Sequence, residues 1–143
     1  MRFPKGSHPA LLWLPVVIYM AAIFYASSLS VVPGPVGDWF SDTILHSACY
    51  GGLALCVLRA FARGRWAGVT VGVAIAAWLF TTLYGVTDEW HQMYVSGRTP
   101  ELRDLANDAI GALGALSVAG AWGIMTAPAR ADARPPSGLS HDL

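Results

Sequence analysis

Four long apolar runs alternate with shorter polar segments along the chain. The runs cover residues 11–28, 43–61, 67–86 and 105–125. Each is close to the roughly 20 residues that an α-helix needs to cross a bilayer. The pattern therefore predicts an all-α integral membrane bundle of four transmembrane helices. The first run is longer than the usual core of a signal peptide, about 7–15 residues, and predicts a retained span rather than a cleaved leader.

The segment that follows the fourth run differs from the rest of the chain. Residues 127–143 mix Pro, Ala and charged residues without apolar periodicity. Such a segment has too little apolar surface to bury, and it predicts a disordered tail. The predicted domain organisation is therefore a four-helix transmembrane domain over residues 1–126 and a disordered cytoplasmic tail over residues 127–143.

Composition supports the membrane interpretation. Only 13% of the 143 residues are charged, whereas soluble domains average about 25%. The formal net charge is zero, so the chain lacks the positive charge with which proteins bind nucleic acid, and we expect no nucleic-acid partner.

The basic residues predict the orientation. If the chain crosses four times, seven of its nine Lys and Arg residues fall on one side: Arg2, Lys5, Arg59, Arg63, Arg65, Arg130 and Arg134. Cytoplasmic loops of membrane proteins are enriched in Lys and Arg. Both termini are therefore predicted to be cytoplasmic, and the segments 29–42 and 87–104 to face outward.

The longest polar stretch between apolar runs extends from Tyr84 to Asn107. It holds four of the nine acidic residues, two of the nine basic ones and one of the four histidines. Because a loop that only connects two helices can be short, a long and chemically dense one is a candidate functional segment.

Helical spacing groups the polar residues at the predicted outer ends of three spans. Residues three or four apart share a helix face. Three sets have this spacing: Asp42, His46 and Tyr50; Tyr84, Asp88 and His91; and Asp104, Asn107, Gly111 and Gly114. Ser27 and Ser28 end the first span at the same level. We therefore predict that the four helices direct these groups to one polar site.

Simpler roles exist for several of these residues. Asp42 and Asp104 have the position of helix N-caps. Tyr50, Tyr84 and Trp90 have the position of interfacial aromatic anchors. Gly111 and Gly114 favour close helix contacts. His46 is the strongest site candidate, because ionisable groups within a span are costly and usually functional.

Taken together, the polar blocks resemble a known family. The set Asp42, His46 and Tyr50, the motif TDEWHQ at 87–92, the motif SGR at 96–98 and the set Asp104, Asn107 and Gly111 are similar, in order and spacing, to the VanZ-like family. The resemblance covers about residues 11–125. It implies a small multi-pass protein of the bacterial cytoplasmic membrane, and the family's namesake is associated with resistance to the glycopeptide teicoplanin.

The resemblance implies ten site residues, and the chemistry of their side chains divides them into two candidate groups. The first, for acid–base chemistry, is His46, His91, Asp42 and Asp88. The second, for ligand binding, is Tyr50, Glu89, Gln92, Arg98, Asp104 and Asn107. In this hypothesis His46 or His91 is the general base, Asp42 or Asp88 orients it, and Arg98 holds a phosphate.

Three functions stay open on this evidence. The favoured one is binding or modification of a cell-envelope lipid or lipid-linked precursor, with a role in teicoplanin tolerance. The second is a membrane-embedded hydrolase or transferase that uses His and Asp, with Zn²⁺ as an alternative. The motif H-E-x-x-H is absent, so no metal or other cofactor is assigned. The third is a non-catalytic protein whose polar residues tie the helices together.

Overall fold

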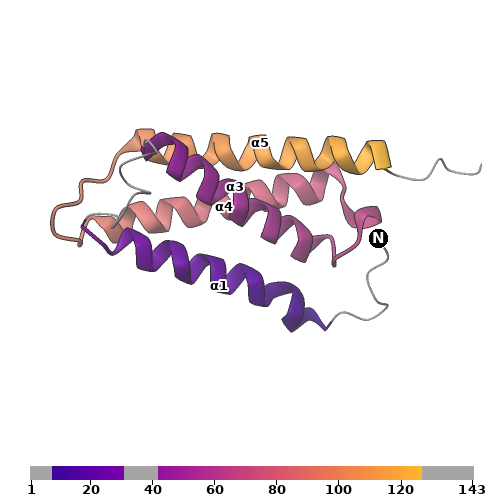
Figure 1. Cartoon of the computed structure of the whole chain (residues 1–143), viewed down its shortest axis with the longest axis horizontal. Helices are drawn as coiled ribbons and strands as arrows, with labels where there is room; N and C mark the ends of the chain where they lie inside the picture. Colours follow the sequence, from indigo (N-terminus) through magenta and orange to yellow (C-terminus); the bar gives the residue numbers. More distant parts are fainter. Residues whose placement is uncertain (1–7, 31–41, 127–143) are drawn as a thin grey trace, which may run out of the picture.

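The computed structural model describes residues 8–30 and 42–126, and in this part of the chain every long element is a helix (Figure 1). The helices are α1 (Pro9–Ser27), α3 (Asp42–Phe61), α4 (Val71–Gln92) and α5 (Leu102–Thr126), with a short 3₁₀ turn, η1 (Trp66–Gly68), between α3 and α4. The prediction of an all-α, four-helix protein is confirmed for these residues. The predicted tail, 127–143, lies outside them.

The four helices lie lengthwise beside one another, and α3 is central (Figure 1). It packs against α1, α4 and α5, and its contact with α5 is the most extensive in the bundle. The short links at 62–70 and 93–101 make successive helices antiparallel neighbours. The ends of α1 and α4 therefore meet the beginnings of α3 and α5 at one end of the bundle, called here the polar end. The other end, which holds the 62–70 link, is called the arginine end.

The core consists of buried aliphatic side chains and small residues from all four helices. On α3, Leu53, Ala54 and Val57 are completely buried. Nearer the arginine end, the rings of Trp13, Phe61 and Phe80 meet edge to face, with centroids 5.4–6.1 Å apart. Aromatic pairs prefer this geometry, and it joins α1, α3 and α4.

Large apolar side chains also cover the outside of the bundle. Exposed examples occur on each helix, including Tyr25, Leu55, Leu83 and Val118. Water-soluble monomers rarely expose contiguous apolar surface of this kind, whereas a bilayer favours it. Three helices, α1, the Thr43–Phe61 part of α3, and α4, are long and apolar enough to cross a membrane.

The prediction of four spans is thus supported for three helices. Within the residues that the structure describes, α5 is not among the candidate spans, although it is the longest helix. Its first two turns carry Arg103, Asp104, Asn107 and Asp108, which lower its mean hydropathy. The fourth crossing and the positions of the termini stay predictions.

Helix α4, which corresponds to the predicted run 67–86, begins and ends later than predicted, and its later end changes the setting of the site residues. It begins at Val71, where the Thr70 side chain caps the helix by accepting a hydrogen bond from Val73 N (3.2 Å). It then continues to Gln92. The predicted outer segment 87–104 is therefore helical as far as Gln92, and the true link is 93–101. Asp88, Glu89, His91 and Gln92 consequently project from a rigid helix.

Candidate functional site

Two carboxylates of α5 face one histidine of α3. His46 Nδ1 lies 2.9 Å from Asp108 Oδ1, and His46 Nε2 lies 3.7 Å from Asp104 Oδ2. Asp104 and Asp108 are four residues apart and therefore share a face of α5. The Asp108 side chain is 1% exposed and that of His46 is 17% exposed. An ionised Asp108 would hold the proton on Nδ1 and leave Nε2 as the basic nitrogen.

Further contacts fix α3 against α5 around this pair. The Ser47 hydroxyl donates to the carbonyl oxygen of Asn107 (3.1 Å), and the Asn107 amide donates to the Thr43 hydroxyl (3.4 Å). A side chain at Gly111 would overlap the backbone of Ser47. Gly111 is therefore a close helix contact, as predicted. Gly114, where a Cβ would meet nothing within 4 Å, is not.

The predicted face of Tyr84, Asp88 and His91 exists and is turned toward α1. The Tyr84 hydroxyl donates to Met20 O (2.7 Å), and the Ser27 hydroxyl donates to Asp88 Oδ1 (2.6 Å). One turn further on, His91 Nε2 lies 3.0 Å from the Ser28 hydroxyl, and its ring stacks on Phe24. These contacts join α1 and α4 along their shared length at the polar end.

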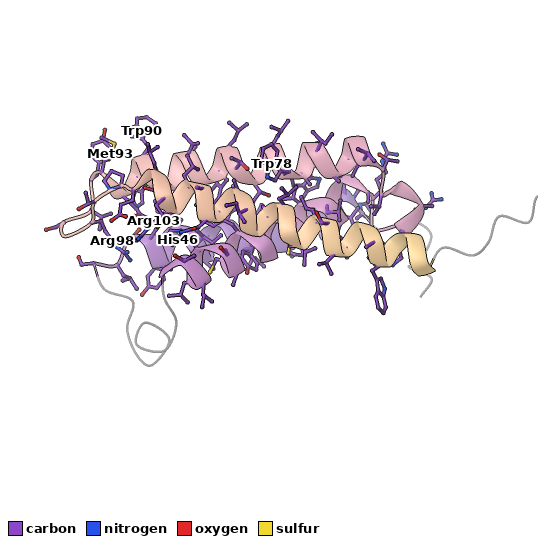
Figure 2. The ribbon with its side chains drawn as sticks, turned by 90° about the horizontal axis from the view of Figure 1, so that it is seen from above. His46, Trp78, Trp90, Met93, Arg98 and Arg103 are labelled. Atoms are coloured by element: carbon purple, nitrogen blue, oxygen red, sulfur yellow. The ribbon has the colours of Figure 1, made fainter. Side chains whose placement is uncertain are left out.

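A cavity of about 250 Å³ lies between these two helix pairs. Its lining comes from α1, α3, α4 and the 93–101 link. The polar members are Ser27, His46, Cys49, Tyr50, Asp88, Gln92 and Arg98, and the apolar members are Ile23, Ala26 and Leu45. Figure 2 shows His46 and Arg98 at the same end of the bundle. The cavity therefore has a buried carboxylate, an imidazole and a guanidinium on its wall.

Two lining residues, Tyr50 and Arg98, have polar groups that lack a full set of hydrogen-bond partners among the described residues. The Tyr50 side chain is almost wholly buried, and its hydroxyl lies near Asp88 without a well-formed hydrogen bond to it. Arg98 donates from Nε to Leu29 O (2.9 Å). Its terminal nitrogens therefore remain the donors for an anion in the cavity.

Gly85 explains why so many groups fit in this space. An added Cβ there would lie 3.2 Å from Asp108 Oδ2 and 3.3 Å from the ring of Tyr50. The absence of a side chain on α4 thus makes room for a carboxylate of α5 and a ring of α3. Trp78 adds a tie between α4 and α5 by donating to Ala109 O (3.0 Å).

The structure brings half of the predicted site residues together. Five line the cavity: His46, Tyr50, Asp88, Gln92 and Arg98. Asp104 is beside His46, outside the lining. Three others form hydrogen bonds outside the cavity lining. His91 contacts Ser28, and Asn107 contacts Thr43. Glu89 Oε2 accepts a hydrogen bond from Glu101 N (2.9 Å) and so anchors the 93–101 link. Asp42 is the first residue of α3, and its side chain lies outside the described part.

Sequence reasoning missed Asp108, the closest partner of His46. It follows the polar stretch 84–107 directly, lies one turn after Asp104 and falls within the apolar run 105–125. In the predicted fourth span it would be an ionisable residue within a membrane helix, a class that is usually functional. Ser27 was recognised only as a polar residue at the end of the first span, and its bond to Asp88 depends on how α1 packs.

Within 8–30 and 42–126, no set of three or more His, Cys, Asp or Glu side chains is arranged to hold a metal ion. The arrangement that is present supports two kinds of chemistry: binding of an anionic or polar headgroup, and proton transfer at His46.

Comparison with known proteins identifies the family. Neither the curated proteins nor the solved structures include a significant match to this chain. The family model described as VanZ/LLP1, in contrast, matches residues 11–123, which include all four helices almost completely. Together with the apolar helices and the polar end, this match shows that the chain is a member of the VanZ/LLP1 family.

Proposed function

We propose that this protein binds the headgroup of a cell-envelope lipid or lipid-linked precursor in the cavity at its polar end. The observation that carries the proposal is the convergence of His46, Asp88 and Arg98, from three segments, on one cavity of about 250 Å³. Ionisable residues within membrane helices are costly, so their convergence favours a ligand site over chance. The positive-inside pattern supports placing this end at the outer leaflet.

The lining suits an amphipathic ligand with a phosphate. The terminal nitrogens of Arg98 supply charge-assisted donors to phosphate oxygens. Asp88 and Gln92 supply acceptors and donors for hydroxyl or amide groups. Ile23, Ala26 and Leu45 give the cavity an apolar side. A membrane lipid likewise combines a polar headgroup with an apolar acyl chain.

A second function, acid–base catalysis on the same ligand, is favoured by the His46–Asp108 pair. A base oriented by a buried carboxylate is the arrangement by which enzymes activate a nucleophile. With Nδ1 held at 2.9 Å by Asp108, His46 Nε2 would accept a proton from water or from a ligand hydroxyl. Hydrolysis or transfer at a phosphate or ester held by Arg98 would follow.

The role in teicoplanin tolerance is proposed on family resemblance. Occupation or modification of an envelope lipid at the outer surface would change the access of a glycopeptide to its target. The competing explanation is a purely structural one, because several polar residues, among them His91 and Asn107, tie helices together. The competing explanations predict different results for Arg98, whose side chain, among the described residues, forms one hydrogen bond, to Leu29 O.

The experiment compares Arg98→Gln with Arg103→Gln. Both arginines lie at the polar end (Figure 2), but Arg103 is exposed and lies outside the cavity lining. Lipids retained by each purified variant are identified by native mass spectrometry, and teicoplanin tolerance is measured in a susceptible host. We expect Arg98→Gln to lose a phosphate-containing lipid and tolerance, and Arg103→Gln to keep both. Equal lipid retention by both variants would contradict the proposal.

The catalytic alternative is tested with His46→Gln. This change keeps a hydrogen-bonding side chain but removes the base. If the protein only binds, the bound lipid stays as it is in the wild type. If it is an enzyme, the variant accumulates a lipid of different mass, which is the unconverted substrate.

A further inference from the structure

A second and larger cavity lies at the arginine end, far from the polar site. It has a volume of about 590 Å³ and lies between α3, the 62–70 link and the second half of α5. Its wall is formed by aliphatic and small residues, with Trp66 and Trp122 beside them. The size falls within the about 300–1,000 Å³ of typical small-molecule sites. An apolar cavity of this size at the edge of a membrane bundle fits an acyl chain.

The polar groups on this cavity are arginines. Arg59, in the last turn of α3, and Arg65, in the link, both contribute to its wall. Within the described part of the chain, neither forms an ion pair, and neither does their neighbour Arg63. Long basic side chains cover apolar surface with their stems and keep the charge at the membrane–water boundary. Tryptophans also favour that boundary.

Among the residues that the structure describes, no carboxylate lies beside these arginines. The acidic residues with described side chains are all at the polar end: Asp88, Glu89, Glu101, Asp104 and Asp108. Within residues 8–30 and 42–126, the arginine end therefore carries positive charge without a nearby carboxylate, directly beside an apolar cavity. A ligand that complements both features has an anionic headgroup and a hydrocarbon chain.

We propose that this cavity is a binding site for an anionic phospholipid of the leaflet at the arginine end, with one acyl chain in the cavity and the phosphate on Arg59 and Arg65. The site is separate from the polar one in position and in ligand charge, and it does not depend on the function proposed above. Basic pockets between membrane helices bind anionic headgroups by the same physics.

The test uses variants at positions that tolerate change. Arg59, Arg63 and Arg65 are all exposed, so their replacement by Gln leaves the core intact. Arg63 loses the same charge but does not line the cavity, and it is the matched control. A Cβ at Gly114, on the cavity wall, meets nothing within 4 Å, so Gly114→Leu starts from an open position and adds a side chain at the cavity wall. Gly120 is equally open but lies outside the wall, so Gly120→Leu is its control.

Each variant is reconstituted in nanodiscs of equimolar phosphatidylglycerol and phosphatidylcholine, and the retained lipids are measured by native mass spectrometry. The wild type should retain phosphatidylglycerol preferentially. Arg59→Gln and Arg65→Gln should each reduce that preference about fivefold, the effect expected of one basic residue at an anionic surface. Arg63→Gln and Gly120→Leu should leave it unchanged, and Gly114→Leu should abolish retention.

Three results would overturn the proposal. An equal loss for Arg63→Gln would mean diffuse attraction to charge rather than a site. Unchanged retention in Gly114→Leu would mean that the chain does not occupy the cavity. A dimer that dissociates in Gly114→Leu, without a change in lipid, would mean that a second copy of the protein covers this face.

Discussion

At the scale of single residues, Asp108 joins the packing of the polar end to the His46 side chain. It is almost wholly buried, it contacts His46, and its second oxygen lies beside the backbone of Gly85. A buried charged pair contributes little net stability, but loss of one partner leaves the other unsatisfied. The pair is therefore a sensitive point both for folding and for the chemistry of His46.

A double-mutant cycle measures this coupling. Asp108→Ala should lower the free energy of unfolding by about 1–3 kcal/mol, because His46 loses its closest partner. His46→Ala should cost a similar amount, and the double variant should cost less than the two effects added together. Unfolding is followed in detergent, with the exposed Arg103→Ala as control. Additive effects would show that the two residues do not form an energetic pair.

The contacts of His91 predict a structural role, in contrast to the ligand-site role proposed for His46. Its contacts are with Ser28 and Phe24, both on or beside α1, and it does not line the cavity. His91→Ala should therefore leave lipid retention unchanged and weaken the α1–α4 contact, with a moderate fall in melting temperature. His46→Ala should remove lipid retention. If His91→Ala abolishes retention while stability is unchanged, the site includes His91, and the cavity described here is only part of it.

At the scale of the helices, small residues decide how closely the polar groups meet. The α3–α5 pair is the most extensive contact in the bundle, and Gly111 lies against the Ser47 backbone within it. Membrane helices pack closely where small residues let their backbones approach, because lipid supplies no hydrophobic force between them. The hydrogen bonds of Ser47 and Asn107 depend on that closeness.

Substitution of two glycines of α5 by alanine should have opposite effects. Gly111→Ala places a methyl group into backbone atoms, which cannot move aside as a side chain can, and should cost about 1–3 kcal/mol of stability. Gly120→Ala meets no atom within 4 Å and should gain up to about 1 kcal/mol from helix propensity. Melting curves in detergent compare the two. Equal stability of both variants would argue against close packing at Gly111.

At the scale of the whole molecule, the two ends carry opposite chemistry. The polar end has the described carboxylates and the histidine–carboxylate pair, and the arginine end has Arg59, Arg63 and Arg65. Only Arg98 and Arg103 among the described basic residues lie at the polar end. Because basic residues favour the cytoplasmic side, this asymmetry predicts that the polar cavity faces outward.

Cysteine labelling from outside the cell tests that orientation. In a background where the free Cys49 and Cys56 are replaced by serine, a membrane-impermeant thiol reagent should label Arg103→Cys and should not label Arg63→Cys. Both side chains are exposed, so a difference in labelling reports the side of the membrane on which each residue lies. The reverse labelling would place the polar cavity in the cytoplasm and exclude a direct role at the outer surface.

The sequence by itself determined the all-α fold class, and it predicted which residues would form a polar site. Run lengths near the thickness of a bilayer predicted the helices, because lipid requires each backbone polar group to be satisfied within a helix. Spacings of three and four residues correctly placed Tyr84, Asp88 and His91 on one face, because the helical repeat is local. The resemblance carried by TDEWHQ, SGR and the polar sets agrees with the family match.

Tertiary structure alone decided which of these residues meet. Whether a face turns toward α1, α5 or the cavity depends on helix rotation and on contacts 60 or more residues apart in sequence, such as His46 with Asp108 and Ser27 with Asp88. No local pattern encodes that choice. For the same reason, only the structure shows that Asp108 contacts His46 and that His91 and Asn107 form hydrogen bonds between helices. It likewise shows an apolar cavity beside the arginines of the 62–70 link.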